Sequence, residues 1–217
     1  MSRFSLVVFD LDGTLVDSRR DLSDSVNALL ADLGGAPLAE DQIGAMVGDG
    51  AGQLVERALA ASGIALPPDA LARFLDHYDR RLVVHTRPYD GIVPLLASLE
   101  ARGVRRAVLT NKPQDAAMRV VERLDLARWF DAGVIGTEAG FAAKPEPAGL
   151  LFLASAAQVP IHRTLMVGDG SQDVETARRA GAPMCIARYG FGYPTAAAVA
   201  DGGELVIDSP EALLVSL

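Results

Sequence analysis

Short apolar runs alternate along much of the chain with segments in which apolar residues recur every three or four positions. The first run, Phe4–Phe9, is rich in β-branched and aromatic residues and ends at a glycine flanked by carboxylates. Comparable runs occur later, each before a polar or glycine-containing turn, at Val104–Leu109, Ala132–Ile135, Thr164–Val167 and Met184–Ala187. The spacing of apolar residues predicts helices between them at Ile92–Arg102, Gln114–Leu124, Glu146–Ala157 and Gln172–Ala180. This alternation predicts an α/β fold with a mostly parallel sheet covered by helices on both faces.

Residues 17–87 interrupt the alternation. Helical patterns follow one another there without a convincing strand between them, at Asp21–Leu33, Glu40–Met46, Gly52–Ala61 and Asp69–Val84. We therefore expect an all-helical cap domain over residues 17–87, inserted into an α/β core of residues 1–16 and 88–217. The two crossings between them would lie at Leu15–Ser18 and Thr86–Asp90. A helical lid over a catalytic sheet is the simplest interpretation.

Composition narrows the choice of partners. The 217 residues include 20 Lys and Arg against 28 Asp and Glu, a formal net charge of −8. This balance disfavours a nucleic-acid surface and an anionic membrane, so we expect a small ligand. The chain carries no signal-like segment and no apolar stretch long enough to span a membrane, which predicts a cytoplasmic protein. Its one cysteine, Cys185, lies in an apolar run and is expected to be a buried small hydrophobe.

The first candidate chemistry is a pair of carboxylates, Asp10 and Asp12, at the end of the first predicted strand. Continued β geometry would place both side chains on one face, with Gly13 allowing a sharp turn behind them. Two carboxylates this close repel each other unless a cation is present or one of them is protonated. The pair suits a metal site, or a nucleophile next to a general acid.

The other predicted strand ends add complementary groups. Thr110 and Asn111 offer a hydroxyl and amide protons, and Lys144 offers a cation. Asp169 and Asp173 supply two further carboxylates, four residues apart. In parallel sheets ligands bind beyond the carboxyl ends of the strands, where all these residues are expected. Together they predict a phosphate site, with the hydroxyl and the ammonium meeting the oxyanion and the carboxylates holding a divalent cation.

In this order the motifs resemble the four motifs of the haloacid-dehalogenase-like phosphohydrolases, whose core is Rossmann-like. The resemblance rests on Asp10-Leu11-Asp12-Gly13-Thr14-Leu15-Val16-Asp17-Ser18, Thr110-Asn111-Lys112, Lys144-Pro145 and Gly168-Asp169-x-x-x-Asp173. Secondary strings are similar to the phosphoglycolate phosphatase branch, namely Val47-Gly48-Asp49-Gly50, Leu54-Val55-Glu56-Arg57-Ala58-Leu59, Arg87-Pro88-Tyr89-Asp90-Gly91, Thr110-Asn111-Lys112-Pro113 and Arg188-Tyr189-Gly190-Phe191-Gly192-Tyr193.

The resemblance implies roles for the residues of the first and fourth motifs. Asp10 would be the nucleophile that accepts the phosphoryl group as an aspartyl phosphate. Asp12 would protonate the leaving alkoxide and then activate water. Asp10, the backbone carbonyl of Asp12 and Asp169 would hold Mg²⁺, and Asp173 would support Lys144 or a metal-bound water.

The second and third motifs would hold the transferring phosphoryl group through Thr110, Asn111 and Lys144. In the predicted cap, the resemblance assigns Gly48 and Gly50 to substrate recognition through their backbone amides. Candidate partners for a substrate carboxylate are the cap and hinge arginines Arg57, Arg80 and Arg87.

One position departs from the family pattern. The residue after Asp169 is often Ser or Thr in this family, and here it is Gly170, which removes a hydroxyl from the surroundings of the metal. Ser171 is the nearest substitute in the sequence.

These observations predict a Mg²⁺-dependent phosphatase of a small phosphorylated metabolite, with 2-phosphoglycolate the best single candidate, acting as a monomer or homodimer. A sugar-phosphate or amino-sugar-phosphate phosphatase with the same core is the nearest alternative, and a phosphomutase is a further one. A dehalogenase would not need the acid Asp12. A response-regulator-like module, which holds its phosphate as a signal, would have no helical lid.

Overall fold

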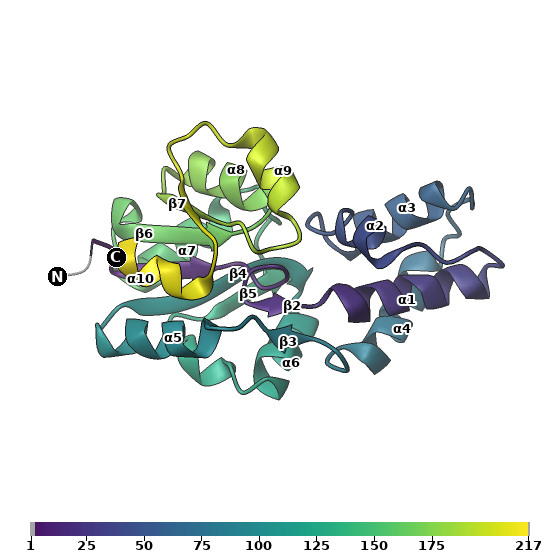
Figure 1. Ribbon diagram of the computed structural model, residues 1–217, viewed down its shortest axis with the longest axis horizontal. Helices are drawn as coiled ribbons and strands as arrows, with labels where there is room; N and C mark the ends of the chain where they lie inside the picture. The colour runs from purple at the N-terminus through teal and green to yellow at the C-terminus, as the bar shows by residue number, and fades with distance from the viewer. Residues whose placement is uncertain (1–2, 217) are drawn as a thin grey trace.

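A six-stranded parallel sheet forms the centre of the protein in the computed structural model, which describes residues 3–216. The strand order is β5-β4-β1-β6-β7-β8, and every pair of neighbours is parallel. Figure 1 shows this sheet with helices around it. The strands are β1 (Leu6–Phe9), β4 (Arg105–Pro113), β5 (Val134–Thr137), β6 (Thr164–Gly168), β7 (Met184–Ala187) and β8 (Leu205–Ile207).

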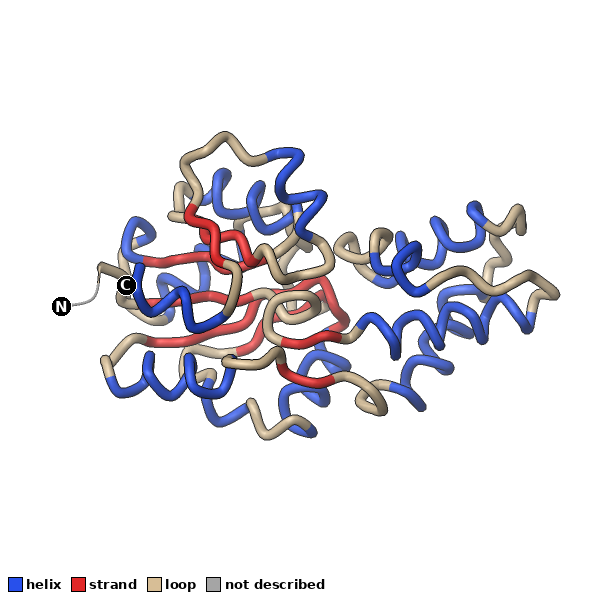
Figure 2. The backbone as a smooth tube through the Cα atoms, viewed as in Figure 1, coloured by secondary structure: helices blue, strands red, loops and turns tan. Residues whose placement is uncertain are grey.

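Strand β1 is apolar at every position because its two faces are buried in different clusters. Val7 and Phe9 pack in one cluster, which includes residues of α5 (Ile92–Ala101) and α6 (Gln114–Arg123). Leu6 and Val8 pack in the other, on the opposite face, with α7 (Ala148–Ala156), α8 (Ser171–Ala180) and α9 (Tyr193–Val199). Helices therefore cover both faces of the sheet (Figure 2), as the sequence predicts.

The polypeptide between β1 and β4 contains a group of helices that lies beyond one end of the sheet (Figure 1). We call helices α1 to α4 the helical insert. Its members are α1 (Arg19–Asp32), α2 (Glu40–Gly44), α3 (Ala51–Ala61) and α4 (Ala70–Arg81). The expected run of four helices without an intervening strand is confirmed. The remaining short elements are η1 (Ala127–Trp129), η2 (Ile161–Arg163), η3 (Pro210–Ala212) and α10 (Leu213–Ser216).

The chain enters and leaves the insert through a two-stranded antiparallel ladder of β2 (Val16–Asp17) and β3 (Arg87–Pro88). Val16 pairs with Pro88 and Asp17 with Arg87, so the predicted boundary between residues 1–16 and 17–87 runs through this ladder. The division into core and cap stays a prediction, and its terminal residues 1–2 and 217 lie outside the described range.

A buried carboxylate joins the first helix of the insert to the segment that leads out of it. Asp21, in the first turn of α1, accepts hydrogen bonds from the backbone N–H groups of Val84 (3.0 Å), His85 (3.0 Å) and Thr86 (2.8 Å), and from the Thr86 hydroxyl (2.7 Å). The side chain is fully buried. One carboxylate thus satisfies three backbone donors that are more than sixty residues away in the sequence.

Several strand ends differ from the sequence-based expectation. Strand β1 begins at Leu6 rather than Phe4, and β4 continues past Leu109 to Pro113, so that Thr110 lies within the strand. The cause is pairing, because β4 meets β5 again at Pro113 after a shift in register. The edge strand β8 and the ladder of β2 and β3 were not expected; each has only two or three residues, too few for a periodic pattern.

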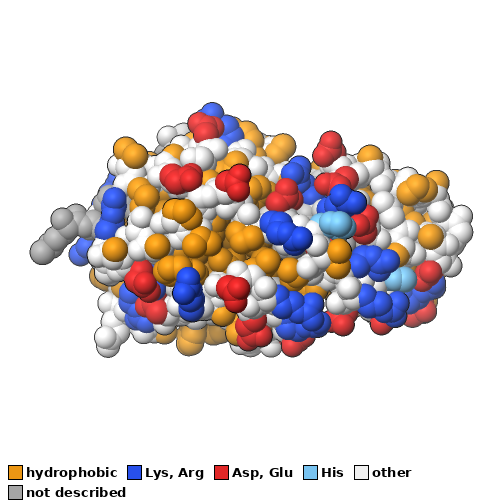
Figure 3. Space-filling model, turned by 60° about the horizontal axis from the view of Figure 1, so that its bottom comes forward, with side chains coloured by type: hydrophobic (Ala, Val, Ile, Leu, Met, Phe, Trp, Pro, Cys, Tyr) orange, Lys and Arg blue, Asp and Glu red, His pale blue; other side chains and the backbone are white. Residues whose placement is uncertain are grey.

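The structure also bears on membrane spanning, on the charged surface and on the cysteine. No helix among residues 3–216 is long and apolar enough to cross a membrane. The face in Figure 3 carries Lys and Arg side chains interspersed with Asp and Glu. Cys185 lies in β7 with no exposed surface, and burial raises the pKa of its thiol to about 12, which confirms its expected place in the core.

Candidate active site

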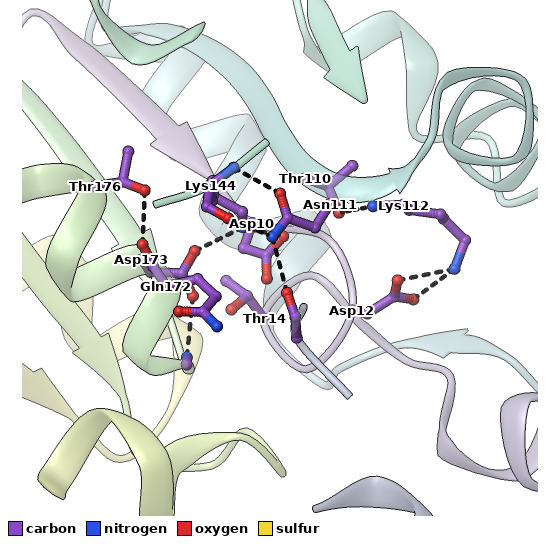
Figure 4. A network of polar contacts seen from close by, with 12 residues as sticks. Asp10, Asp12, Thr14, Thr110, Asn111, Lys112, Lys144, Gln172, Asp173 and Thr176 are labelled. Carbon is purple, nitrogen blue, oxygen red and sulfur yellow. Dashed lines mark hydrogen bonds and ion pairs between the residues drawn. The ribbon is translucent and has the colours of Figure 1, made fainter. Parts of the chain in front are cut away.

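Four predicted site residues meet at one edge of the sheet because β4, β1 and β6 are adjacent and parallel. Asp10 follows β1, Thr110 and Asn111 lie at the end of β4, and Asp169 follows β6. Lys144, from the loop after β5, points into the same group (Figure 4). Beyond this edge lies a cleft whose walls come from both the sheet loops and the helical insert.

Lys144 lies between two carboxylates of the core. Its Nζ is 2.8 Å from Asp10 Oδ1 and 2.7 Å from Asp173 Oδ1, and all three side chains are buried. The other oxygen of Asp173 accepts a hydrogen bond from the Gly170 N–H (3.0 Å). The structure therefore places Asp173 against Lys144, one of the two places expected for it.

Burial dominates the electrostatics of these groups. It raises the pKa of Asp10 to about 6, an effect that the Lys144 ammonium opposes and the nearby Asp173 carboxylate reinforces. Burial also raises the pKa of Asp169 well above its usual value, and Asp10 and Asp173 add to this increase. For Lys144, burial acts against the charged form, but the adjacent carboxylates outweigh it and raise the pKa of the ammonium.

Asp12 faces a different lysine. Lys112 Nζ donates to both of its carboxylate oxygens, at 2.9 and 2.8 Å, and the Ser18 hydroxyl donates to one of them at 2.6 Å. Figure 4 shows this carboxylate on the side of Asp10 opposite Asp173. The expectation that β geometry continues through Asp12 is wrong. The strand ends at Phe9, and the chain turns because the Leu11 carbonyl accepts backbone N–H groups from the turn that follows.

Asp169 is held by a hydroxyl and a backbone N–H rather than by cations. Its two oxygens accept hydrogen bonds from the Thr14 hydroxyl (3.0 Å) and the Gly192 N–H (2.7 Å). A Cβ atom on Gly13, Gly190 or Gly192 would come within 3.0 Å of its side chain, so only glycine leaves it room at these positions. The string Arg188–Tyr193 was noted in the sequence without a role, and its Gly-x-Gly spacing is the signal that marks this wall of the site.

The acidic groups fit a divalent cation. Asp10, Asp169 and Asp173 each offer an oxygen within 4.8 Å of the others. Asp10 and Asp173 face the Lys144 ammonium and Asp12 faces that of Lys112, whereas Asp169 pairs with neither lysine. When all four carboxylates are ionised, they exceed the two ammonium groups by two negative charges, and carboxylate oxygens are ligands that suit Mg²⁺. The Asp12 carboxylate, held by Lys112, lies outside the cluster.

Comparison with known proteins decides the family. The model of the haloacid dehalogenase-like hydrolases matches residues 4–181. The chain belongs to this family. A phosphoglycolate phosphatase of Rhodospirillum rubrum is 43% identical over 193 residues, covering 85% of this chain and 80% of that one. One of Agrobacterium fabrum is 37% identical over 216 residues, covering 98% and 91%.

A solved structure agrees with this assignment. The crystal structure of a predicted phosphoglycolate phosphatase from Haemophilus somnus superimposes with a TM-score of 0.89 at 28% identity, covering all of both chains. The relatives and the family place this haloacid dehalogenase-like hydrolase among the phosphatases, which are phosphoric monoester hydrolases.

In this hydrolase the Asn111 side chain serves the framework of the site. Its amide group donates to the carbonyls of Gly48 and Lys144, both at 2.9 Å, and its oxygen accepts the Lys144 N–H at 2.8 Å. Both amide protons are therefore used, so the phosphate contact expected of Asn111 is not available from this side chain. The Thr110 hydroxyl accepts the Lys112 N–H (3.2 Å) and keeps its own proton for another partner.

Only some of the candidate residues of the insert and its hinge line the cleft. Gly48 and Gly50 line the cleft with positive φ values of 131° and 88°. Arg57 also lines the cleft, but its guanidinium is paired with Asp49. The other candidate arginines are turned elsewhere: Arg80 pairs with a neighbour on its own helix, and Arg87 donates to two backbone carbonyls.

Gly170 is accommodated without a replacement hydroxyl at Asp169. The Ser171 hydroxyl donates to the Gln172 side chain at 3.3 Å, so the substitute offered by the sequence is not directed to Asp169. Instead the Ser171 N–H donates to the Thr195 hydroxyl at 3.0 Å, which joins α8 to α9 at the rim of the cleft.

Lys112 and Tyr78 are the site residues that sequence reasoning missed. Tyr78 is on α4 of the insert, and its ring centroid lies 4.8 Å from Lys112 Nζ. Burial acts against the charge of Lys112, but Asp12 and Tyr78 outweigh it and raise the pKa of this ammonium. The available signal was a lysine in an otherwise uncharged, buried strand end, since a cation there needs a partner.

Proposed function

We propose that this enzyme hydrolyses a small phosphomonoester, 2-phosphoglycolate, with Mg²⁺ as cofactor and an aspartyl phosphate as intermediate. The observation that carries the proposal is the position of Asp10, a buried carboxylate beside both an ammonium and two further carboxylates at the floor of the cleft. The names of the relatives support the choice of substrate.

In the first step an oxygen of Asp10 attacks phosphorus while the bond from phosphorus to the ester oxygen breaks. Lys144 lies where it offsets the charge of both the nucleophile and the incoming phosphate. Thr110 offers its hydroxyl proton to a phosphoryl oxygen. The leaving alkoxide takes a proton from Asp12, whose side chain lines the same cleft.

In the second step a water molecule attacks the phosphorus of the aspartyl phosphate. Asp12, now a carboxylate, accepts the proton of this water, and the bond between phosphorus and Asp10 breaks to release inorganic phosphate. Asp10, Asp169 and the Asp12 carbonyl would hold Mg²⁺, which supplies positive charge for the phosphoryl oxygens.

The cleft above Asp12 favours a small leaving group. The insert lines it with Leu22, Leu54, Phe74 and Tyr78, and the Gly48–Gly50 loop completes this wall. These apolar side chains limit the water that can reach Asp12 once a substrate is bound. A short organic group fits between them and the end of β4.

The test is a panel of phosphomonoesters turned over by the purified protein in Mg²⁺ and in EDTA. The panel contains 2-phosphoglycolate, a hexose phosphate, an amino-sugar phosphate and p-nitrophenyl phosphate, with Asp10→Asn as the matched inactive control. We expect the highest kcat/KM for 2-phosphoglycolate, loss of activity in EDTA, and no turnover by D10N.

Each part of the proposal has its own contrary outcome. A higher kcat/KM for a sugar phosphate would overturn the substrate, and undiminished rates in EDTA would overturn the cofactor. Turnover by D10N at the wild-type rate would overturn the covalent mechanism. Asp10→Asn is nearly isosteric, so a normal unfolding temperature is expected for this variant.

A further inference from the structure

The carboxylate of Asp12 is held from two directions. Lys112 Nζ contacts both of its oxygens, and Ser18 donates to Oδ1. The Lys112 side chain is only 2% exposed and that of Asp12 12% exposed, so water competes little for this contact. Lys112 therefore fixes the direction in which the Asp12 carboxylate points.

The ammonium that holds Asp12 is itself covered by the insert. Tyr78 is buried on α4, stacks on Phe74 with ring centroids 5.7 Å apart, and presents its ring to Lys112. An ammonium over an aromatic face is attracted to it, more strongly when both are shielded from water. Lys112 thus lies between a carboxylate of the core and a ring of the insert.

The surroundings of Lys144 provide a contrast. Both of its ionic partners, Asp10 and Asp173, belong to the core, so displacement of the insert would leave these contacts in place. Displacement of the insert would remove the ring from Lys112 and open its ion pair with Asp12 to water. The direction of Asp12 is then less restricted.

We propose that Lys112 is a positioning residue that directs the Asp12 carboxylate, and that Tyr78 makes this positioning depend on the insert lying over the site. The inference rests on the proposed acid and base roles of Asp12. It assigns to the second motif a task besides phosphate binding, which is to transmit the position of the insert to the proton donor.

The consequence appears in the dependence on the leaving group. An alkyl leaving group needs a proton from Asp12, whereas p-nitrophenolate leaves readily without one. Lys112→Met keeps the apolar stem but removes the ammonium, so Asp12 loses the contact that directs it. We expect kcat for an alkyl phosphate to fall by roughly 10–100-fold, less than the roughly 10²–10⁴-fold contributed by a general acid, and kcat for p-nitrophenyl phosphate to fall much less.

The experiment measures kcat and KM for p-nitrophenyl phosphate and for the alkyl phosphate that the wild type turns over best. Lys112→Met, Lys112→Arg and Tyr78→Leu are compared with Arg119→Met, a matched control. Arg119 lies on α6 and pairs with Asp79, next to Tyr78, but this ion pair is exposed and far weaker in effect. We expect partial recovery with arginine, a loss in the same sense with Tyr78→Leu, and at most a twofold change with Arg119→Met.

A double-mutant cycle with Asp12→Ala gives the decisive reading. Because Lys112 acts through Asp12, Lys112→Met should cost nothing further in the Asp12→Ala background. Equal losses for both substrates, or additive losses in the cycle, would overturn the inference. If Lys112→Met fails to fold, Lys112→Arg and Tyr78→Leu still report the substrate dependence. If Asp12→Ala itself shows no leaving-group dependence, the proposed role of Asp12 is what fails.

Discussion

The two buried lysines of the site have different surroundings although both lie beside an aspartate of the first motif. Lys144 is enclosed by core carboxylates, and its backbone is fixed by Asn111. Lys112 has one carboxylate and one aromatic ring, and the ring comes from the insert. Removing one partner of a buried ion pair leaves an uncompensated charge, so neither lysine is a replaceable surface cation. The same site therefore contains one ammonium that is held by carboxylates at the edge of the sheet and one that is shared between such a carboxylate and the insert.

The largest effect that distinguishes the surroundings of Lys112 from those of Lys144 is expected from Asp12→Ala. Loss of the proton donor should lower kcat for an alkyl phosphate by roughly 10²–10⁴-fold and that for p-nitrophenyl phosphate by much less. Steady-state kinetics with both substrates provides the measurement. A loss of the same size for both would show that Asp12 does not protonate the leaving group.

Lys144→Ala tests the lysine whose ionic partners are Asp10 and Asp173. The ammonium meets the phosphoryl group whatever the leaving group, so kcat should fall by roughly 10²–10³-fold for both substrates. Added Mg²⁺ should not restore kcat. Lys144→Arg should recover only part of the activity, because the planar guanidinium keeps the positive charge but is wider than an ammonium. A loss confined to alkyl phosphates would place Lys144 with Asp12 and remove the distinction between the lysines.

Cation binding should couple to pH through Asp10 and Asp169. Because the pKa of Asp10 rises from 3.8 to about 6 on folding, its contribution to stability is greatest at low pH and is lost as the pH rises through 6. Asp169 acts in the same direction. Mg²⁺ should therefore raise the unfolding temperature more at pH 7.5 than at pH 5. At a hundred times its Kd, we expect Mg²⁺ to raise the unfolding temperature by about 5–10 °C at pH 7.5.

Thermal unfolding in Mg²⁺ and in EDTA at both pH values checks this coupling. Asp169→Asn is expected to lose most of the gain, since it removes a charge from the cluster without changing its shape. An equal gain at the two pH values in the wild type would show that protons and the cation do not compete for these carboxylates.

The smallest effect is expected from the loop of the insert. Gly50→Ala adds a Cβ 3.4 Å from the Asn111 carbonyl at a φ of 88°, while Gly63→Ala has a similar φ of 66° and no neighbour within 4 Å. Both should lose about 1 kcal/mol of stability. Only Gly50→Ala should alter, by a few-fold, the kcat/KM ratio between 2-phosphoglycolate and p-nitrophenyl phosphate. Equal ratios in the two variants would make the loop an ordinary turn.

Features that depend on residues close together in the sequence were predictable, and features that depend on distant residues were less so. The buried strands and the insert helices were predictable because their apolar periodicity is local and repeats over several residues. The convergence of Asp10, Thr110 and Asp169 followed from the parallel topology. The two-residue strands β2 and β3 left no periodic pattern, and their pairing depends on contacts seventy residues apart.

Side-chain partners were less predictable than positions. Lys112 was visible in the second motif, but its link to Asp12 spans 100 residues and its ring partner lies on a helix with no motif of its own. Asn111 was expected at the phosphate because an amide can donate there, yet the same protons satisfy carbonyls of Gly48 and Lys144. Residue chemistry limits what a side chain can do, and only packing decides among the options.

The position of β1 in the middle of the sheet has a consequence for biosynthesis. This strand leaves the ribosome first among the six, yet its neighbours β4 and β6 start about 100 and 160 residues later, at Arg105 and Thr164. The insert helices, whose hydrogen bonds are local, can form while β1 still has two unpaired edges. Such long-range pairing is slow and leaves apolar strand edges open to other nascent chains. The first motif therefore emerges well before its partners, since Lys112 follows Asp12 by 100 residues and β6 begins later still.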